Sequence, residues 1–415
     1  MQEYVMGNGA IALGALAAGV NLVAGYPGTP SSEILETISK YRHDGVYIEW
    51  SVNEKAAMEV AAAAAYSGAR AMVTMKQVGL NVAADPLMSL AYVGVKGGMV
   101  IVSADDPGPI SSQTEQDTRR FADFCRIPVF DPSSPEEAYK MIGDAFEYSE
   151  KYNTPVLFRP TTRVCHAYAS IDNCDSPSPK KYEGFVKDSK KWVIFPRLSF
   201  ANHIMIEKRN VEIGKDFSTY SANEAEGGNS EKAVVTSGIS YAYTKECLKD
   251  YPDVKLIKIA TAYPFPEDFV LSSLEGAKEV LCIEELSPFI EEQILKLAGK
   301  HGLQLKVSGK LDGKVQAGGE NSTDKIAAIL GEFLGKDFTA EGYDLSDAPA
   351  LPVRPPVLCA GCPHRASFYA VKQAMKGRKA YFCGDIGCYT LGNAMPLDMV
   401  DTCLCMGAGI TMAQG

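Results

Sequence analysis

Two thiols, Cys359 and Cys362, stand two residues apart in the stretch CAGCPHRASFYAV and give the sequence its strongest chemical signal. Cysteines at this spacing hold zinc, form a redox dithiol or ligate an iron–sulfur cluster. A zinc site made of two such pairs needs a second pair, which the sequence lacks. Cys388, in GDIGCY, offers a third thiol, so three ligands of a 4Fe–4S cluster are predicted to converge; buried cysteines without a ligand role are the alternative. His364 follows the pair directly, and we expect a polar role for it beside the thiols.

A carboxylate suited to acid–base chemistry, Glu54, stands at the head of the predicted helix NEKAAMEVAAAAAYSG. Runs of alanine let another backbone or a flat ring approach such a helix closely. Glu54 is therefore a candidate catalytic residue, and the alternative is that it only interacts with the helix dipole. Glu59, one turn later, is the rival carboxylate, and we expect it to pack at the edge of the core.

The stretch YPGTPSSEI is a candidate ligand loop. It puts two prolines and Gly28 in a strand-to-helix turn, with Ser31 or Ser32 as the helix cap. Backbone N–H groups and hydroxyls at a helix N-terminus attract an anion or a polar ligand, although a well-capped turn needs no ligand. The hydroxyl of Thr29 would decide between these readings, because it faces outward only if the loop lines a cleft.

A second polar loop, ADDPGPISSQTEQDTRRFADF, leads into a helix. We expect Asp105 and Asp106 at its start, and the SSQ in its middle, to be exposed. Loops of this kind often carry binding groups. Arg119 and Arg120 are predicted to be solvated surface charges, with a contact to a substrate carboxylate as the alternative.

The elements that position these residues follow an alternating pattern. Up to about residue 160, helical segments alternate with short apolar runs, namely NLVAGY, VYIEW, RAMVTM, GGMVIVSAD, PVFD and PVLFRP. This alternation is typical of a parallel sheet with helices on both faces. Ligands of such sheets bind beyond the carboxyl ends of the strands, where YPGTPSSE and NEKAA are placed. A second α/β set runs from AVVTSGIS to LQLKVSG.

We therefore predict an α/β protein with doubly wound parallel sheets in three domains. The expected boundaries are a first domain at 1–165, a linker region with a short helix at 166–230, a second domain at 231–337, a Pro-rich linker at 338–355 and an incomplete third domain at 356–415. The third domain should contain the helix ASFYAVKQAMKG, the strand KAYFCGD and an apolar ending, CMGAGITMAQG, that resembles a buried helix.

Composition narrows the function classes. The chain has 415 residues and a formal net charge of -10, and its 41 Lys and Arg are scattered rather than clustered. Neither a nucleic-acid patch nor a membrane patch is therefore predicted. The first residues are apolar but lack a basic segment and a cleavage signal, so we expect a cytoplasmic protein that acts on small molecules.

Several stretches together resemble the alpha subunits of indolepyruvate ferredoxin oxidoreductases, members of the thiamine-diphosphate-dependent 2-oxoacid:ferredoxin oxidoreductase family. The resemblance covers nearly the whole chain and is weakest between about 166 and 230. It is carried by YPGTPSSE, SVNEKAAME, MKQVGLN, DDPGPISSQTEQDTRRFA, TSGISYAY, CAGCPHR, GDIGCYTLG and CMGAGI.

The resemblance implies a thiamine-diphosphate-binding fold with a pyrimidine-binding domain first, a transketolase-C-terminal-like domain second and a diphosphate-binding domain last. Glu54 matches the glutamate that hydrogen-bonds the aminopyrimidine ring, and an apolar surround would let it share a proton with a ring nitrogen. Thr29 matches the residue near the 2-oxoacid. The implied cofactor-binding residues are Tyr26, Pro27, Gly28, Glu54, Gly79, His364, Gly384, Asp385, Gly387, Met406 and Gly407.

The reaction implied by the resemblance is oxidative decarboxylation of a 2-oxoacid, with coenzyme A taking the acyl group and ferredoxin the electrons. The implied cofactors are thiamine diphosphate, Mg2+ and 4Fe–4S clusters, with Cys359, Cys362 and Cys388 as ligands. The implied assembly is α2β2 with a small beta subunit. Pyruvate enzymes of the family carry an arginine where this chain reads SADD, which favours an aryl pyruvate as the substrate.

Two departures from the family pattern limit these implications. The 415 residues contain neither the GDS or GDG motif that clamps Mg2+ on the diphosphate nor the C-x2-C-x2-C-x3-C runs of a ferredoxin-like segment. We expect this chain by itself neither to hold Mg–thiamine diphosphate firmly nor to pass electrons onward. The alternatives are a non-redox thiamine-dependent 2-oxoacid decarboxylase, an oxidoreductase acting on another 2-oxoacid, and a non-catalytic subunit stabilised by a metal.

Overall fold

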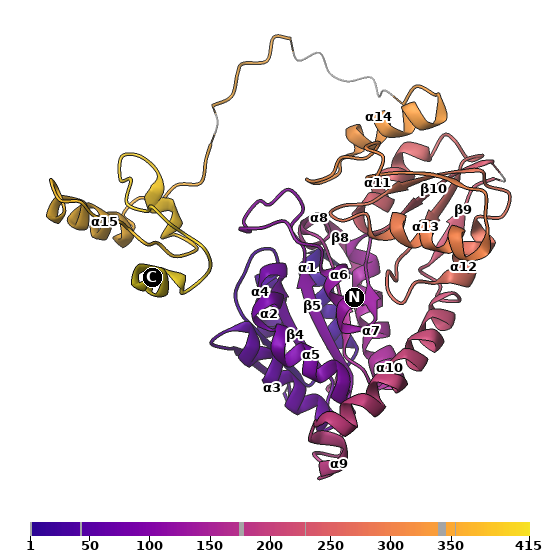
Figure 1. Ribbon diagram of the computed structural model, residues 1–415, viewed down its shortest axis with the longest axis horizontal. Helices are drawn as coiled ribbons and strands as arrows, with labels where there is room; N and C mark the ends of the chain where they lie inside the picture. Colours follow the sequence, from indigo (N-terminus) through magenta and orange to yellow (C-terminus); the bar gives the residue numbers. More distant parts are fainter. Residues whose placement is uncertain (1, 42–43, 174–177, 229, 339–345, 353) are drawn as a thin grey trace. The chain divides into compact units, whose positions relative to one another are not determined.

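The computed structural model describes residues 2–41, 44–173, 178–228, 230–338, 346–352 and 354–415 (Figure 1). The chain divides into two compact units, one up to residue 340 and one from residue 341. The domains predicted at 1–165 and 231–337 thus belong to a single unit. Of the predicted Pro-rich linker, residues 346–352 contain turns but no helix or strand.

The first sheet of this unit has six strands, all paired in parallel, as the alternating pattern predicts. Apolar residues fill both faces of its central strands, and all six residues of the strand Met99–Ala104 are buried. In order across the sheet, the strands are β3 (Tyr47–Trp50), β2 (Leu22–Gly25), β4 (Ala71–Lys76), β5 (Met99–Ala104), β7 (Val156–Phe158) and β6 (Val129–Phe130).

Helices cover both faces of this sheet. Two apolar clusters divide them: α1 (Gly7–Ala17), α2 (Ser32–Tyr41) and α7 (Pro135–Tyr152) on one face, and α3 (Glu54–Tyr66), α4 (Gln77–Val82), α5 (Ala84–Val93) and α6 (Thr118–Cys125) on the other. The chain leaves β2 for β3 on one side and then returns to β4 on the other side of β2. Doubly wound sheets bind ligands at such a reversal, so the loops after β2 and β4 mark the expected binding edge.

The segment predicted to be a linker contains both strands and helices in its described residues. The strand β8 (Tyr168–Asp172) pairs antiparallel with β1 (Gln2–Met6), after the short helix α8 (Thr162–His166). The short helix predicted near Trp192 forms as the four-residue α9 (Ser189–Trp192). It is followed by a helix that was not predicted, α10 (Pro196–Phe217), which has 22 residues. Among the described residues, no helix is both long and apolar enough to cross a bilayer.

The second sheet belongs to the same unit, and α10 packs against both α5 and the helix α12 (Glu267–Ser273) (Figure 1). Its strand order is β13 (Lys306–Ser308), β12 (Glu279–Ile283), β10 (Lys232–Thr236), β11 (Lys255–Lys258) and β9 (Glu224–Glu226), parallel except for β9. The helices α11 (Gly238–Leu248) and α14 (Thr323–Leu334) cover one face, and α12 (Glu267–Ser273) and α13 (Phe289–His301) cover the other. One apolar cluster runs from the first sheet into the second, which explains why the two form one unit.

The second unit contains little regular structure. Its helices are α15 (Pro363–Ala374), the 3-10 turn η1 (Thr390–Asn393) and α16 (Ala408–Gln414). The strand predicted for KAYFCGD is wrong, because only Cys383 forms a bridge, with Thr402, and neither flanking segment extends it. The predicted burial of the last helix is also wrong: Ile410 of α16 is 85% exposed.

Candidate active site

Glu54 opens α3 at the edge of the first sheet where the strands end. Asn53 caps the helix, since its side chain accepts a hydrogen bond of 2.8 Å from the N–H of Ala56. The Glu54 side chain is turned inward and the residue is only 8% exposed. Burial raises the pKa of Glu54, opposed by its own backbone N–H and by the charge of Lys76. No side chain in the described part of the chain donates a hydrogen bond to this carboxylate.

Gly79, in α4, makes room for that carboxylate. A Cβ at this position would lie 2.5 Å from Oε1 of Glu54, closer than any real contact. Beside it, the fully buried Gln77 donates through Nε2 to the carbonyl of Thr114, at 3.2 Å, whereas its Oε1 has no partner within the described ranges. The buried acid therefore occupies a space that a single methyl group at Gly79 would fill, and an orphaned acceptor lies two residues away in the same helix. Glu59, by contrast, is exposed and pairs with Lys55 at 3.3 Å, so the expected core-edge position is wrong.

The YPGTP loop follows β2 and is closed by its own hydroxyls. Ser31 donates to the carbonyl of Gly28 at 2.9 Å, and the N–H of Gly28 donates to the hydroxyl of Ser32 at 2.8 Å. Both serines thus close the turn on Gly28, rather than capping the helix as we expected. Thr29 and Pro27 are exposed and Tyr26 is half-buried, so the loop offers its surface to a ligand.

The polar loop after β5 differs from its prediction. Asp105 and Asp106 are buried, at 0% and 1% exposure, although we expected them at the surface. Asp106 accepts hydrogen bonds of 3.1 Å from the backbone N–H groups of Ile110 and Ser111, and one of 2.7 Å from the hydroxyl of Thr162. The two carboxylates therefore hold the loop from inside, and the hydroxyl of Ser111 reaches the carbonyl of Thr29 at 3.3 Å.

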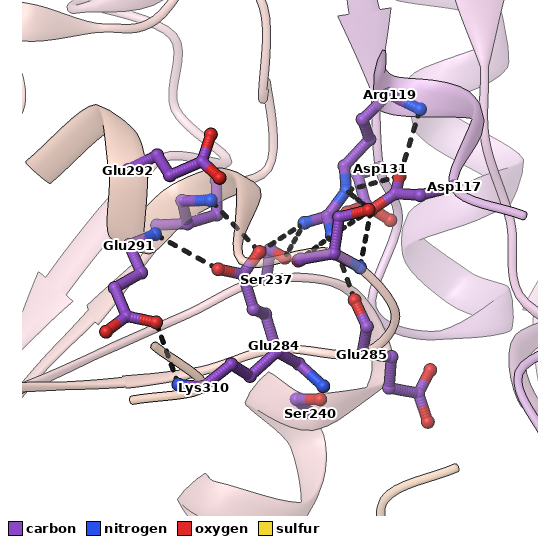
Figure 2. Close-up of polar contacts among 12 residues, drawn as sticks. Asp117, Arg119, Asp131, Ser237, Ser240, Glu284, Glu285, Glu291, Glu292 and Lys310 are labelled. Carbon is purple, nitrogen blue, oxygen red and sulfur yellow. Dashed lines mark hydrogen bonds and ion pairs between the residues drawn. The ribbon is translucent and has the colours of Figure 1, made fainter. Parts of the chain in front are cut away.

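Arg119 is also buried, with 0% of its side chain exposed, so the prediction of a surface charge is wrong. Figure 2 shows its guanidinium between Asp117, at 2.7 Å, and Glu284 of the second sheet domain, at 2.8 Å. It also donates to the backbone carbonyls of Glu285 and Ser287, at 2.9 and 3.1 Å. Burial alone would raise the pKa of Asp117, but the charges of Arg119 and Arg159 and the hydrogen bonds from Arg119 together outweigh it and lower this pKa to about 2.

The second unit gathers its predicted cofactor residues around one carboxylate. Both oxygens of Asp385 accept from the N–H of Gly407, at 2.8 and 2.9 Å, which joins GDIG to CMGAG. A Cβ at Gly384 would lie 2.6 Å from Val400, and Gly387 has a φ of 98°, so both positions favour glycine. Met406, beside Gly407, is 58% exposed.

The predicted thiol ligands do not form a metal site in this structure. The rings of His364 and Tyr389 pack edge to face, with their centroids 4.8 Å apart, so CAGCPHR and GDIGCYT lie together. The Nδ1 atom of His364 also lies 3.2 Å from the sulfur of Cys362. However, no group of three or more His, Cys, Asp or Glu side chains in the described residues is arranged to hold a metal ion. None of the three predicted ligands, Cys359, Cys362 and Cys388, forms a disulfide. Their convergence on a cluster stays a prediction.

Comparisons with known proteins identify the family. Residues 13–214 match the family described as pyruvate flavodoxin/ferredoxin oxidoreductase, thiamine diphosphate-binding. The indolepyruvate oxidoreductase subunit IorA of Thermococcus kodakarensis is 42% identical over 99% of this chain and 65% of its own length. The IorA subunit of Methanothermobacter thermautotrophicus is 40% identical over 99% of this chain and 68% of its own. The chain belongs to the indolepyruvate oxidoreductase IorA family.

The IorA family assignment agrees with the fold. A structure of 2-oxoglutarate:ferredoxin oxidoreductase from Magnetococcus marinus superposes with a TM-score of 0.63 at 17% identity, over 80% of this chain and 65% of that one. This match supports the thiamine-diphosphate α/β fold that the sequence resemblance implied. The chain spans about two thirds of the length of the IorA relatives.

The residues in the first unit fit thiamine diphosphate, whereas those expected to hold metals do not. Glu54, Gly79 and the orphaned Oε1 of Gln77 provide a buried acid, a space without a Cβ and an unused acceptor, as an aminopyrimidine ring would require. The described residues provide no matching arrangement for an iron–sulfur cluster or for Mg2+.

Proposed function

We propose that this chain is the thiamine-diphosphate-binding part of an enzyme that oxidatively decarboxylates aryl pyruvates such as indolepyruvate. The observation that carries the proposal is the buried carboxylate of Glu54 against Gly79, to which no side chain of the described residues donates, in a chain 42% identical to an IorA subunit. We assign the pyrimidine-binding role to the first sheet domain. The second sheet domain is the proposed counterpart of the transketolase C-terminal domain.

Glu54 has the proposed catalytic role of sharing a proton with a ring nitrogen of the aminopyrimidine. Its raised pKa suits this role, because a carboxyl group with a pKa nearer neutrality exchanges a proton more readily at physiological pH. The Oε1 atom of Gln77 would accept from an N–H of the same ring. When bound, the cofactor would supply a nucleophilic thiazolium carbon and a positively charged ring that accepts the electron pair left as CO2 departs.

Replacing Gly79 with Ala should weaken thiamine diphosphate binding by about tenfold or more, because the added methyl group displaces the Glu54 carboxylate. The measurement is a titration of the cofactor into the full-length protein, followed by calorimetry. Gly143→Ala in α7 is the matched control, since a Cβ there meets nothing closer than 3.9 Å. Equal cofactor affinity in the Gly79→Ala protein and the wild type would show that Glu54 does not need this space.

The proposed reaction is balanced with coenzyme A and ferredoxin. One 2-oxoacid and one thiol give one acyl thioester, one CO2, one proton and two electrons, and two oxidised ferredoxins take the electrons. The aryl preference follows the name shared by the IorA relatives. The structural relative from Magnetococcus marinus was solved with 2-oxoglutarate, coenzyme A and succinyl-CoA, which supports the acceptor chemistry.

The remaining partners stay predictions of the resemblance. We propose a small beta subunit in an α2β2 assembly and a cytoplasmic location. No step of the proposed reaction depends here on a 4Fe–4S cluster or on Mg2+, because the described residues form no site for either. The predicted cluster ligands are Cys359, Cys362 and Cys388, and the predicted place of Mg2+ is the diphosphate.

The substrate profile of the full-length complex tests the proposed function. With coenzyme A and a viologen acceptor, the rate for indolepyruvate at limiting concentration should exceed that for pyruvate about tenfold or more, in keeping with the discrimination that a pocket for a large apolar side chain provides. A clear preference for pyruvate would overturn the aryl assignment. Release of free aldehyde without any electron acceptor would instead identify a non-redox decarboxylase.

A further inference from the structure

The end of β4 carries a positive charge that has not been assigned a role in binding the cofactor. Lys76 is the last residue of β4, between the loops that follow β2 and β5 in the sheet. It lies opposite Ala104 in the register with β5. This is the binding edge at the strand-order reversal, where ligands of doubly wound sheets are held.

The side chain of Lys76 is fixed by the two neighbouring loops. Its stem lies against Gly28, where a Cβ would come within 3.2 Å of Cγ and Cδ. Its ammonium donates a hydrogen bond of 3.2 Å to the backbone carbonyl of Ser111. Ser111 in turn bonds Thr29, so both loops and Lys76 meet at one place. Lys76 is half-buried there, and its hydrogen bond to Ser111 is exposed.

No carboxylate neutralises this ammonium at contact distance. In the described part of the chain, Lys76 has no ion-pair partner within 4 Å. Asp106 attracts it from further away, but Asp106 is already committed to Ile110, Ser111 and Thr162. Burial lowers the pKa of Lys76, with Asp106 and Glu54 opposing this, as expected for a partly desolvated cation without a paired anion.

We propose that Lys76 binds the carboxylate of the 2-oxoacid and so positions the substrate beside Thr29. The inference rests on the proposed function, because it takes a 2-oxoacid as the substrate. A carboxylate accepting from a partly desolvated ammonium forms a charge-assisted hydrogen bond, which is stronger than one between neutral groups. Asp105 and Asp106, which follow β5, would repel the carboxylate of the substrate. Lys76, at the end of the neighbouring strand β4, would attract it.

The test compares a carboxylate with its amide in full-length protein. The probes are 3-(indol-3-yl)propionate, which is an unreactive analogue, and the corresponding propionamide. We expect the wild type to bind the carboxylate about 10- to 100-fold more tightly than the amide, and Lys76→Met to lose that preference. Lys76→Arg should keep part of it, because it retains the charge. A preference that persists in Lys76→Met would overturn the inference.

Kinetics of the full complex provide the second readout. In Lys76→Met the KM for indolepyruvate should rise about 10- to 100-fold with a smaller change in kcat. A rise in the KM for coenzyme A, or weaker binding of thiamine diphosphate, with the KM for the 2-oxoacid unchanged would show that Lys76 serves a phosphate and would overturn the proposal. Lys140→Met, on the exposed side of α7, is the control for a lost lysine charge.

The two proposals fail in different ways. A wild-type complex that oxidises no 2-oxoacid would refute the proposed function. A wild-type complex that is active while Lys76→Met keeps its KM and its preference for the carboxylate probe would refute only the role of Lys76. If Lys76→Met does not fold, Lys76→Arg and Lys76→Gln carry the same comparison, and equal carboxylate preference in those two proteins would count against the role.

Discussion

Glu54→Gln should lower kcat of the full-length complex by about 10²- to 10⁴-fold, with little change in thermal stability. Glutamine keeps the shape of the side chain and the contact with Gly79, but an amide cannot share a proton with a ring nitrogen. The carboxyl group it replaces is buried and has a raised pKa, which are the properties that the proton transfer needs. Initial rates at saturating substrate and cofactor give kcat directly, and a thermal melt reports the fold.

Glu59→Gln is the matched control for this change. It alters the same side chain five residues later on the same helix, where the carboxylate is exposed and pairs with Lys55 at 3.3 Å. We expect it to keep nearly all of the wild-type kcat. If Glu54→Gln were as active as Glu59→Gln, the buried carboxylate would have no part in the chemistry and the proposed site would lie elsewhere.

Arg119→Met should lower the free energy of unfolding of the first unit by about 3 to 5 kcal/mol, because it leaves buried carboxylates without their cation. The guanidinium touches Asp117 and Glu284, both at most 2% exposed, and joins residues 165 positions apart in the sequence. Urea unfolding followed by tryptophan fluorescence and far-UV circular dichroism provides the measurement. Arg119→Lys should lose less, since it keeps the charge but only part of the fork of hydrogen bonds.

Arg120→Met tests whether the effect comes from burial rather than from charge. Arg120 is the next residue and pairs with Glu292, but its side chain is 38% exposed. Exposed ion pairs contribute at most about 1 kcal/mol, so this change should be small. Equal losses for Arg119→Met and Arg120→Met would contradict the view that the buried Arg119 holds the two sheet domains together.

The sequence predicted the first sheet well because its signal is local. Apolar runs such as GGMVIVSAD and the alanine-rich helix after Asn53 need no knowledge of distant residues, and both elements form where expected. The position of Glu54 in the first turn follows from the same local pattern. Its burial against Gly79, however, depends on a close approach between two helices that only the folded chain shows.

The buried charges could not be predicted in the same way. Asp105, Asp106 and Arg119 lie in a polar, proline-containing stretch that looks like a surface loop in the sequence. Their burial depends on partners far along the chain, such as Arg159 for Asp105 and Glu284 for Arg119. The 22-residue helix α10 was missed for a related reason: only four of its residues are buried, so its apolar periodicity is weak.

The three hydrogen bonds that Asp106 accepts have a consequence for affinity. They come from within the protein, from Ile110, Ser111 and Thr162, so the segment carrying the Ser111 carbonyl has its shape before any ligand arrives. A ligand that finds its receptor already ordered does not have to offset the entropy of arranging it. More of the intrinsic binding energy is then left for discrimination among substrates.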